Sequence, residues 1–174
     1  QGAQPIISYN YGANNAYRVK KAFRLLLISC LTYSAILWLL AMVVPNMFAA
    51  IFTSDPALTE ITVWALRIYM GGCLLFGAQI ACQQTFIALG NAKTSAFLAM
   101  FRKIIVLIPL IYILPMFIED KVMAVFLAEP IADILAVLTT VTMFVLFFKK
   151  LLRNMDEEHV EEAKQQTQLE EKEA

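Results

Sequence analysis

Long apolar stretches separated by short polar segments make up most of this chain. Four of them are each long enough to cross a bilayer core of about 30 Å at about 1.5 Å per residue: Leu25–Val44, Ile61–Ala88, Ala96–Ile118 and Val122–Phe148. A water-soluble chain of 174 residues has too little polar surface to cover four such stretches. The pattern therefore predicts an all-α fold, a polytopic membrane helix bundle with four transmembrane helices.

The polar segments between the stretches predict how the chain is divided. Residues 1–22 are expected to be the end of a truncated transmembrane helix plus a cytoplasmic basic loop, 23–150 to hold the four transmembrane helices, and 151–174 to form a polar cytoplasmic tail. Thr53–Pro56 is typical of a helix start, because a capping side chain precedes a proline at the first helical position. Gly90–Lys93 predicts a tight turn between the second and third helices.

Basic residues are sorted between alternate polar segments. The segment before the first stretch, the segment between the second and third, and residues 149–153 just after the fourth carry eight Lys and Arg residues, whereas the other two segments carry only Lys121. The positive-inside rule places the larger set on the cytoplasmic side. We therefore expect a multi-pass protein of the cell (inner) membrane, surrounded by membrane lipid, with a cytoplasmic C-terminus. The eight residues are Arg18, Lys20, Lys21, Arg24, Lys93, Lys149, Lys150 and Arg153.

Composition argues against several other classes of protein. Hydrophobic residues make up 60% of the chain and charged residues 16%, with a mean hydropathy of +0.66, which is outside the usual range of soluble domains. The formal net charge of zero indicates no nucleic-acid partner. Cys30, Cys73 and Cys82 lie inside apolar stretches and the single histidine, His159, lies in the tail, so we expect no metal site and no disulfide framework. No nucleophile–base pair is visible, and we expect no cofactor and no enzymatic activity.

Several short motifs occur in an order that resembles the multidrug and toxic compound extrusion (MATE) transporters. Gln4–Ala13, followed by Arg18–Ala22, resembles the motif that ends the second helix of each half of these transporters at the cytoplasmic face. Further matches along the chain are Phe52–Pro56, Gln84 with Ala88–Ser95, Arg102 with Ile108–Leu110, and Pro130–Asp133. The likeness is carried by the ordered set, which spans most of the chain, because each motif alone is weak.

The resemblance implies a fold of about twelve helices in two pseudo-symmetric lobes, with this chain supplying the end of the eighth helix and the four that follow. It implies a secondary active antiporter that exports organic cations or drugs in exchange for H⁺ or Na⁺ by alternating access, with the missing N-terminal lobe of the same protein as partner. A lipid-precursor flippase of the same superfamily and a non-transporting membrane assembly subunit are the alternatives. Some members use an acidic residue in the tenth helix for cation coupling. Between Trp64 and Ala88 this chain has none, so that role is not carried over.

Charged residues inside the apolar stretches are candidate functional residues, because a charge within a membrane is costly. Glu129 and Asp133 are four residues apart and share a helix face, and both are candidates for ion coupling. Arg67 and Glu129 lie about 9 and 10 Å from the outer ends of their stretches and are predicted to form a structural ion pair. Asp133 lies one turn deeper, where a structural hydrogen bond is the alternative to a coupling role. Arg102 and Lys103 are expected to anchor the inner end of their helix by snorkelling.

Polar and aromatic side chains in the same stretches are candidates for a substrate cavity. Gln79 and Gln83 are four residues apart and either join helices or line a wet cavity. Tyr33, Tyr69 and Phe76 could offer an aromatic surface to a small organic cation, with core or lipid-facing packing as the alternative.

Overall fold

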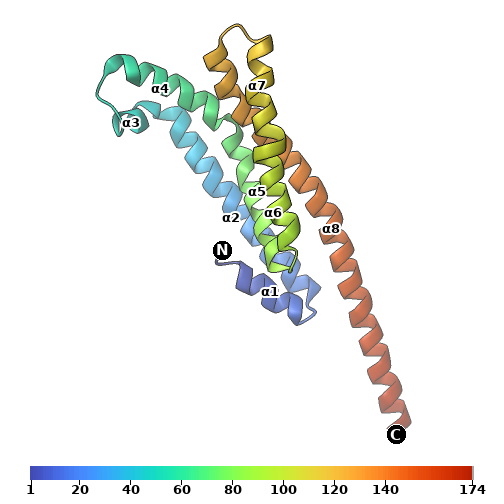
Figure 1. Cartoon of the computed structure of the whole chain (residues 1–174). Coiled ribbons are helices and arrows are strands. Elements are labelled where there is room, and N and C mark those ends of the chain that lie inside the picture. Colours follow the sequence, from blue (N-terminus) through green and yellow to red (C-terminus); the bar gives the residue numbers. More distant parts are fainter. Residues whose placement is uncertain (174) are drawn as a thin grey trace.

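The computed structural model describes residues 1–173, which are helical nearly throughout and contain no β-strand. The elements in chain order are α1 (Gln4–Gly12), α2 (Ala16–Val43), α3 (Pro45–Ala50), α4 (Pro56–Tyr69), η1 (Met70–Gly72), α5 (Cys73–Ala88), α6 (Ala92–Met100), η2 (Phe101–Leu107), α7 (Ile108–Phe117) and α8 (Lys121–Glu173). They form a bundle in which α1 lies beside the start of α2 and α8 extends past the other helices (Figure 1). The prediction of an all-α fold is confirmed for the described residues.

Four continuous helical segments in the part of the chain that the structure describes are long and apolar enough to cross a membrane. They are Ala16–Val43, Pro56–Ala88, Ala92–Phe117 and Lys121–Glu158. Large apolar side chains cover much of their outer surface, which suits contact with lipid rather than with water. The four transmembrane helices predicted from the sequence are therefore confirmed. The first and last of them run without a break through the boundaries expected at residues 22/23 and 150/151.

Local sequence signals determine where the helices start and stop. Asp55 accepts a hydrogen bond from the backbone N–H of Ala57, and Pro56 is the first residue of α4, as the sequence predicts. Gly90, between α5 and α6, has a φ of +80°, a left-handed conformation that costs glycine little. The predicted tight turn at this glycine is confirmed.

Two of the spans contain a turn that is not α-helical. The second span passes through η1, a 3₁₀ turn that contains Gly71 and Gly72, and α4 leans away from the line of α5 at this point (Figure 1). The third span passes through η2, seven residues of π-helix between α6 and α7. Such turns change the direction of a helix or of its side chains, and they occur often at functional sites.

Helices α2 and α5 approach each other closely at Gly77. A Cβ added at Gly77 of α5 would lie 2.6 Å from the carbonyl oxygen of Cys30 and 2.6 Å from Oγ of Ser34, both on α2. Glycine is therefore required here for the two backbones to approach. Toward the end where α2 begins, an aromatic and aliphatic core joins α1, α2, α5, α6 and α8. It includes Ile7, Val19, Phe86, Leu98, Phe144 and Phe148.

Candidate functional site

Three elements bring charged and aromatic side chains together inside the bundle. Arg102 of η2 donates hydrogen bonds from Nη2 to Oε1 of Glu129 at 2.9 Å and from Nε to Oδ1 of Asp133 at 2.5 Å. Both acidic residues belong to α8. The guanidinium also lies over the ring of Phe76 on α5, with Cζ 4.9 Å from the ring centroid. We call Arg102, Glu129 and Asp133 the charged cluster.

The π-helical turn carries the basic member of the cluster. Arg102 is the second residue of η2, where hydrogen bonds join residues i and i+5 and the turn is wider than in an α-helix. Pro109 follows just beyond this turn and has no N–H to donate to the carbonyl of Ile105. One regular α-helical bond is thus already lost in this stretch, which favours an irregular turn at the place where Arg102 must be aimed at α8.

The acidic members are placed by the spacing on α8 and by a glycine opposite them. Glu129 and Asp133 are one turn apart, so that one guanidinium reaches both. A Cβ at Gly72 of η1 would lie 2.8 Å from Cβ of Asp133 and 3.0 Å from its Oδ2. A Cβ at the neighbouring Gly71 would meet Pro130 at 3.7 Å, an ordinary contact. The absence of a side chain at Gly72 therefore leaves the space that the side chain of Asp133 occupies.

The charges of the cluster do not balance. The side chains of Arg102, Glu129 and Asp133 are only 14%, 17% and 9% exposed. One guanidinium faces two carboxylates, so the fully ionised cluster carries an excess negative charge in a low-dielectric interior, which is unfavourable. One additional proton or monovalent cation neutralises it. The described residues include no group of three or more His, Cys, Asp or Glu side chains suited to a bound metal ion.

The structure corrects the predicted ion pair between Arg67 and Glu129. Glu129 pairs with Arg102 instead, and Arg67 is exposed and takes part in no ion pair among the described residues. Arg67 lies two residues after the buried Ala65, and about 200° around the helix places it on the opposite side of α4. Two charged side chains must lie at the same depth in the membrane to form an ion pair, but equal depth does not determine which face of its helix each side chain occupies.

The structure also corrects the role expected for Arg102. It turns inward to the two carboxylates rather than snorkelling to the membrane surface. Arg102 lies ten residues after the start of α6, about 15 Å along the span, so the nearby carboxylates are better partners than a distant interface. The signal was present in the sequence, because two acids on one helix face need a buried cation. Lys103, the next residue, is exposed.

The cavity candidates do not line one common space. The ring of Phe76 lies against the guanidinium of Arg102, and the half-exposed Tyr69 lies near Glu129 and Asp133. Tyr33 lies on the outer surface of α2 and is 65% exposed.

The two glutamines lie in a different place, with a third polar residue that the sequence reasoning did not single out. Oε1 of Gln79, Nε2 of Gln83 and Oγ1 of Thr140 are buried and have no hydrogen-bond partner among the residues that the structure describes. Gln79 follows Gly72 by seven residues and Thr140 follows Asp133 by seven, so Gln79 and Thr140 lie at one level where α5 faces α8. Nothing in an apolar stretch distinguishes such a threonine from one that packs in the core.

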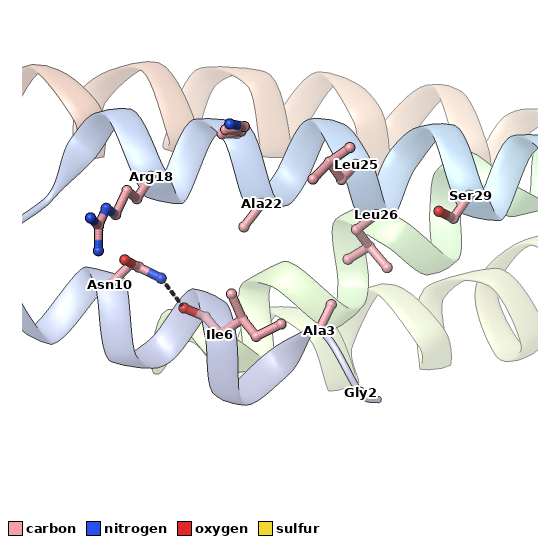
Figure 2. A pocket seen from close by; sticks show the side chains of 10 residues that line it. Gly2, Ala3, Ile6, Asn10, Arg18, Ala22, Leu25, Leu26 and Ser29 are labelled. Carbon is pink, nitrogen blue, oxygen red and sulfur yellow. Dashed lines mark hydrogen bonds between the residues drawn. The ribbon is translucent and has the colours of Figure 1, made fainter.

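A separate cavity of about 540 Å³ lies between α1 and α2, away from the charged cluster. Figure 2 shows Ala3, the residue before α1, and Ile6 of α1 facing Ala22 and Leu26 of α2, with Arg18 at one end near Asn10. Its lining is mainly apolar, and it contains none of the residues predicted to carry function.

Two of the motifs that resemble MATE transporters, at residues 4–13 and 84–95, lie in contact in the structure. Gln4 of α1 donates from Nε2 to Oε1 of Gln84 at 2.5 Å, and Ser8 donates from Oγ to the carbonyl of Ala88 at 2.7 Å. A family model described as MatE matches residues 1–113. The chain belongs to the MATE family.

Solved structures of MATE transporters show the same arrangement of helices. The MATE multidrug transporter DinF-BH is 34% identical over 82% of this chain, with a TM-score of 0.74. An inward-facing and an outward-facing structure of a multidrug resistance MATE transporter of the MOP superfamily are each 16% identical over 87% of this chain, with TM-scores of 0.80 and 0.79. The chain spans about a third of the length of these structures, 31 to 35%. A comparison with curated proteins finds no match.

Proposed function

We propose that this MATE chain is part of the C-terminal lobe of a secondary active antiporter, which exports organic cations in exchange for H⁺ or Na⁺ by alternating access. Membership of the family supports a role in transport. The observation that carries the choice of ion coupling is the buried charged cluster, in which two carboxylates share one guanidinium. The other lobe is the partner that this proposal requires, because alternating access takes place between two lobes.

The coupling step uses the excess charge of the cluster. When a proton or Na⁺ joins Glu129 and Asp133, the cluster becomes neutral and is stable in a closed, dry interior. When the ion leaves, the excess negative charge favours a hydrated, open arrangement. The 3₁₀ turn η1 and the π-helical turn η2 lie beside the cluster and are the places where the second and third spans can bend.

The substrate class follows from the surroundings of the same cluster. A cation is attracted both by excess carboxylate charge and by the faces of aromatic rings. Phe76 lies against the cluster and Tyr69 lies nearby, so an organic cation and the coupling ion would compete for one region of negative potential. Binding of either one weakens binding of the other, which is the requirement for exchange.

The orientation proposed for the chain rests on its charges. The end of the bundle at which α2 and α6 begin and α5 ends carries eight basic residues, which lie in Arg18–Arg24, at Lys93 and in Lys149–Arg153, and we call it the basic end. We place the basic end at the cytoplasmic face of the cell (inner) membrane. This puts the C-terminus inside.

Asp133→Asn in the transporter that carries this chain with its second lobe tests the coupling. The change leaves Arg102 and Glu129 as a balanced pair, so we expect normal expression and folding. Because the excess charge is gone, efflux of a fluorescent organic cation should no longer respond to an imposed H⁺ or Na⁺ gradient. The measurement is dye efflux from proteoliposomes with and without each gradient.

Arg67→Gln is the matched control, since it removes an intramembrane charge that lies outside the cluster. It should retain gradient-driven efflux. Wild-type gradient dependence in a folded Asp133→Asn protein would show that Asp133 is structural and that coupling lies elsewhere.

A further inference from the structure

A cleft at the basic end lies between the first turns of α2 and the part of α8 just beyond its apolar stretch. Its volume is about 470 Å³. Ala16 of α2 and Leu152 of α8 supply apolar surface within it. The cleft is separate from the charged cluster and from the cavity between α1 and α2, and neither the family nor the proposed transport cycle gives it a role.

The polar side chains of the cleft come from one face of each helix. Tyr17 and Lys20 are three residues apart on α2, and Lys149 and Arg153 are four apart on α8. Residues at these spacings lie above one another on a helix, so the three cations face the same space. Asp156 is the acidic residue of the cleft and lies one turn beyond Arg153, on the side away from the apolar span.

The charge of the cleft suits a phosphate group. Three basic residues face one acid, and a positive surplus remains even if Asp156 offsets one of them. Arg153 also approaches Glu157 at 3.7 Å, but these side chains are 69% and 71% exposed, and such a pair is weak in water. Lysine and arginine donate to phosphate oxygens from several directions, which makes a phosphate monoester or diester the ligand chemistry that fits.

The position of the cleft selects a lipid as the source of that phosphate. Lys149 directly follows the apolar stretch, where Val145 and Leu146 are 40% and 67% exposed on the outer surface of α8. Tyr17 is 73% exposed and stands at the level of the span ends, where tyrosine favours the interface between lipid and water. A phospholipid with its phosphate in the cleft can lay an acyl chain along α8, whereas a soluble phosphate has no such second contact.

We propose that this cleft binds the headgroup of an anionic phospholipid from the adjoining leaflet, with Lys20, Lys149 and Arg153 contacting the phosphate and Tyr17 at the interface. The lipid joins the first span to the fourth at the basic end. This binding does not depend on ion coupling or on transport.

Lipid retention by the purified protein tests the proposal. The protein in detergent is titrated with phosphatidylglycerol, phosphatidylcholine or soluble glycerol phosphate, and bound lipid is counted by native mass spectrometry. Phosphatidylglycerol should be retained by the wild-type protein. Lys20→Gln combined with Lys149→Gln should weaken that retention by about fivefold for each lysine, since each basic residue attracts an anionic headgroup independently. Both lysines are exposed, so the variant should fold normally.

Two further variants keep the test specific. Lys93→Gln removes an exposed basic residue from the same end of the bundle but outside the cleft, and it should leave retention unchanged. Lys20→Arg with Lys149→Arg keeps the charges and should bind as the wild type does. Equal losses for Lys93→Gln and the cleft variant, equal retention of phosphatidylcholine, or competition by glycerol phosphate at the same concentration would each overturn the proposal.

Discussion

Two buried threonines differ in whether their hydroxyl groups form a hydrogen bond. Thr85 of α5 and Thr140 of α8 are both 0% exposed. The Thr85 hydroxyl donates to the carbonyl of Ala81 at 2.8 Å, the local bond that satisfies a threonine within a helix. The Thr140 hydroxyl has no hydrogen-bond partner in the described part of the chain. A buried donor without a partner loses its hydration and gains nothing in return, so the two residues should respond in opposite ways to loss of the hydroxyl.

Thr140→Val should leave the stability of the protein unchanged or raise it by up to about 1 kcal/mol, because valine has nearly the same shape and no unsatisfied group. Thr85→Val should lower stability by about 1 kcal/mol, because it removes a formed hydrogen bond. Melting of the two variants in detergent, followed by fluorescence, measures both changes. A clear drop for Thr140→Val would mean that its hydroxyl is bound, for example by an internal water shared with Gln79.

The sequence allowed only part of the charged cluster to be predicted. Glu129 and Asp133 were identified because their spacing is visible in one helix and acids are rare inside a membrane. The sequence predicts Arg67 as the partner of Glu129, whereas both acids pair with Arg102, because depth can be counted along the chain but the rotation of one helix against another cannot. The π-helical turn that carries Arg102 has no reliable local signature, so its position depends on packing against α8.

Among the helices, the features with local causes were the predictable ones. The spans follow from the length of the apolar stretches, the start of α4 from the cap at Asp55, and the turn after α5 from Gly90. The lean of α4 and the close approach of α2 to α5 depend on contacts between residues that are distant in the chain. The glycines of the second span are compatible with a close neighbour or a bend, but the sequence alone does not show that Gly77 makes the contact with α2 or that Gly72 leaves space for Asp133.

Gly77→Ala should therefore damage the bundle. The added Cβ would meet the carbonyl oxygen of Cys30 at 2.6 Å, and backbone cannot move aside as a flexible side chain can. We expect a loss of about 1–3 kcal/mol in stability, as for other overpacked sites. Gly71→Ala is the matched change, since its Cβ would make an ordinary contact at 3.7 Å with Pro130. Thermal melting in detergent compares the two, and equal melting temperatures would contradict the packing of α2 on α5.

At the scale of the whole molecule, charge and apolar surface divide the chain between two environments. The basic end gathers the lysines and arginines of three polar segments, together with the cleft between α2 and α8. The opposite end carries Asp55, Glu60, Glu119 and Asp120, with Lys121 as its one basic residue. Between them the surface is dominated by exposed apolar side chains. By the positive-inside rule, an arrangement of this kind predicts both the membrane plane and the direction in which the spans cross it.

Labelling of single cysteines in intact cells tests that direction. The background lacks the three native cysteines, all of which lie within the spans. Ser54→Cys, at the acidic end, should react with a membrane-impermeant maleimide added outside, because it lies exposed before α4. Lys93→Cys and Asn154→Cys, both exposed at the basic end, should react only after the membrane is opened with detergent. If Lys93→Cys reacts from outside while Asn154→Cys does not, the four-span topology is wrong. If both basic-end sites react from outside and Ser54→Cys is protected, the chain has four spans but the opposite orientation to the one that the charges assign.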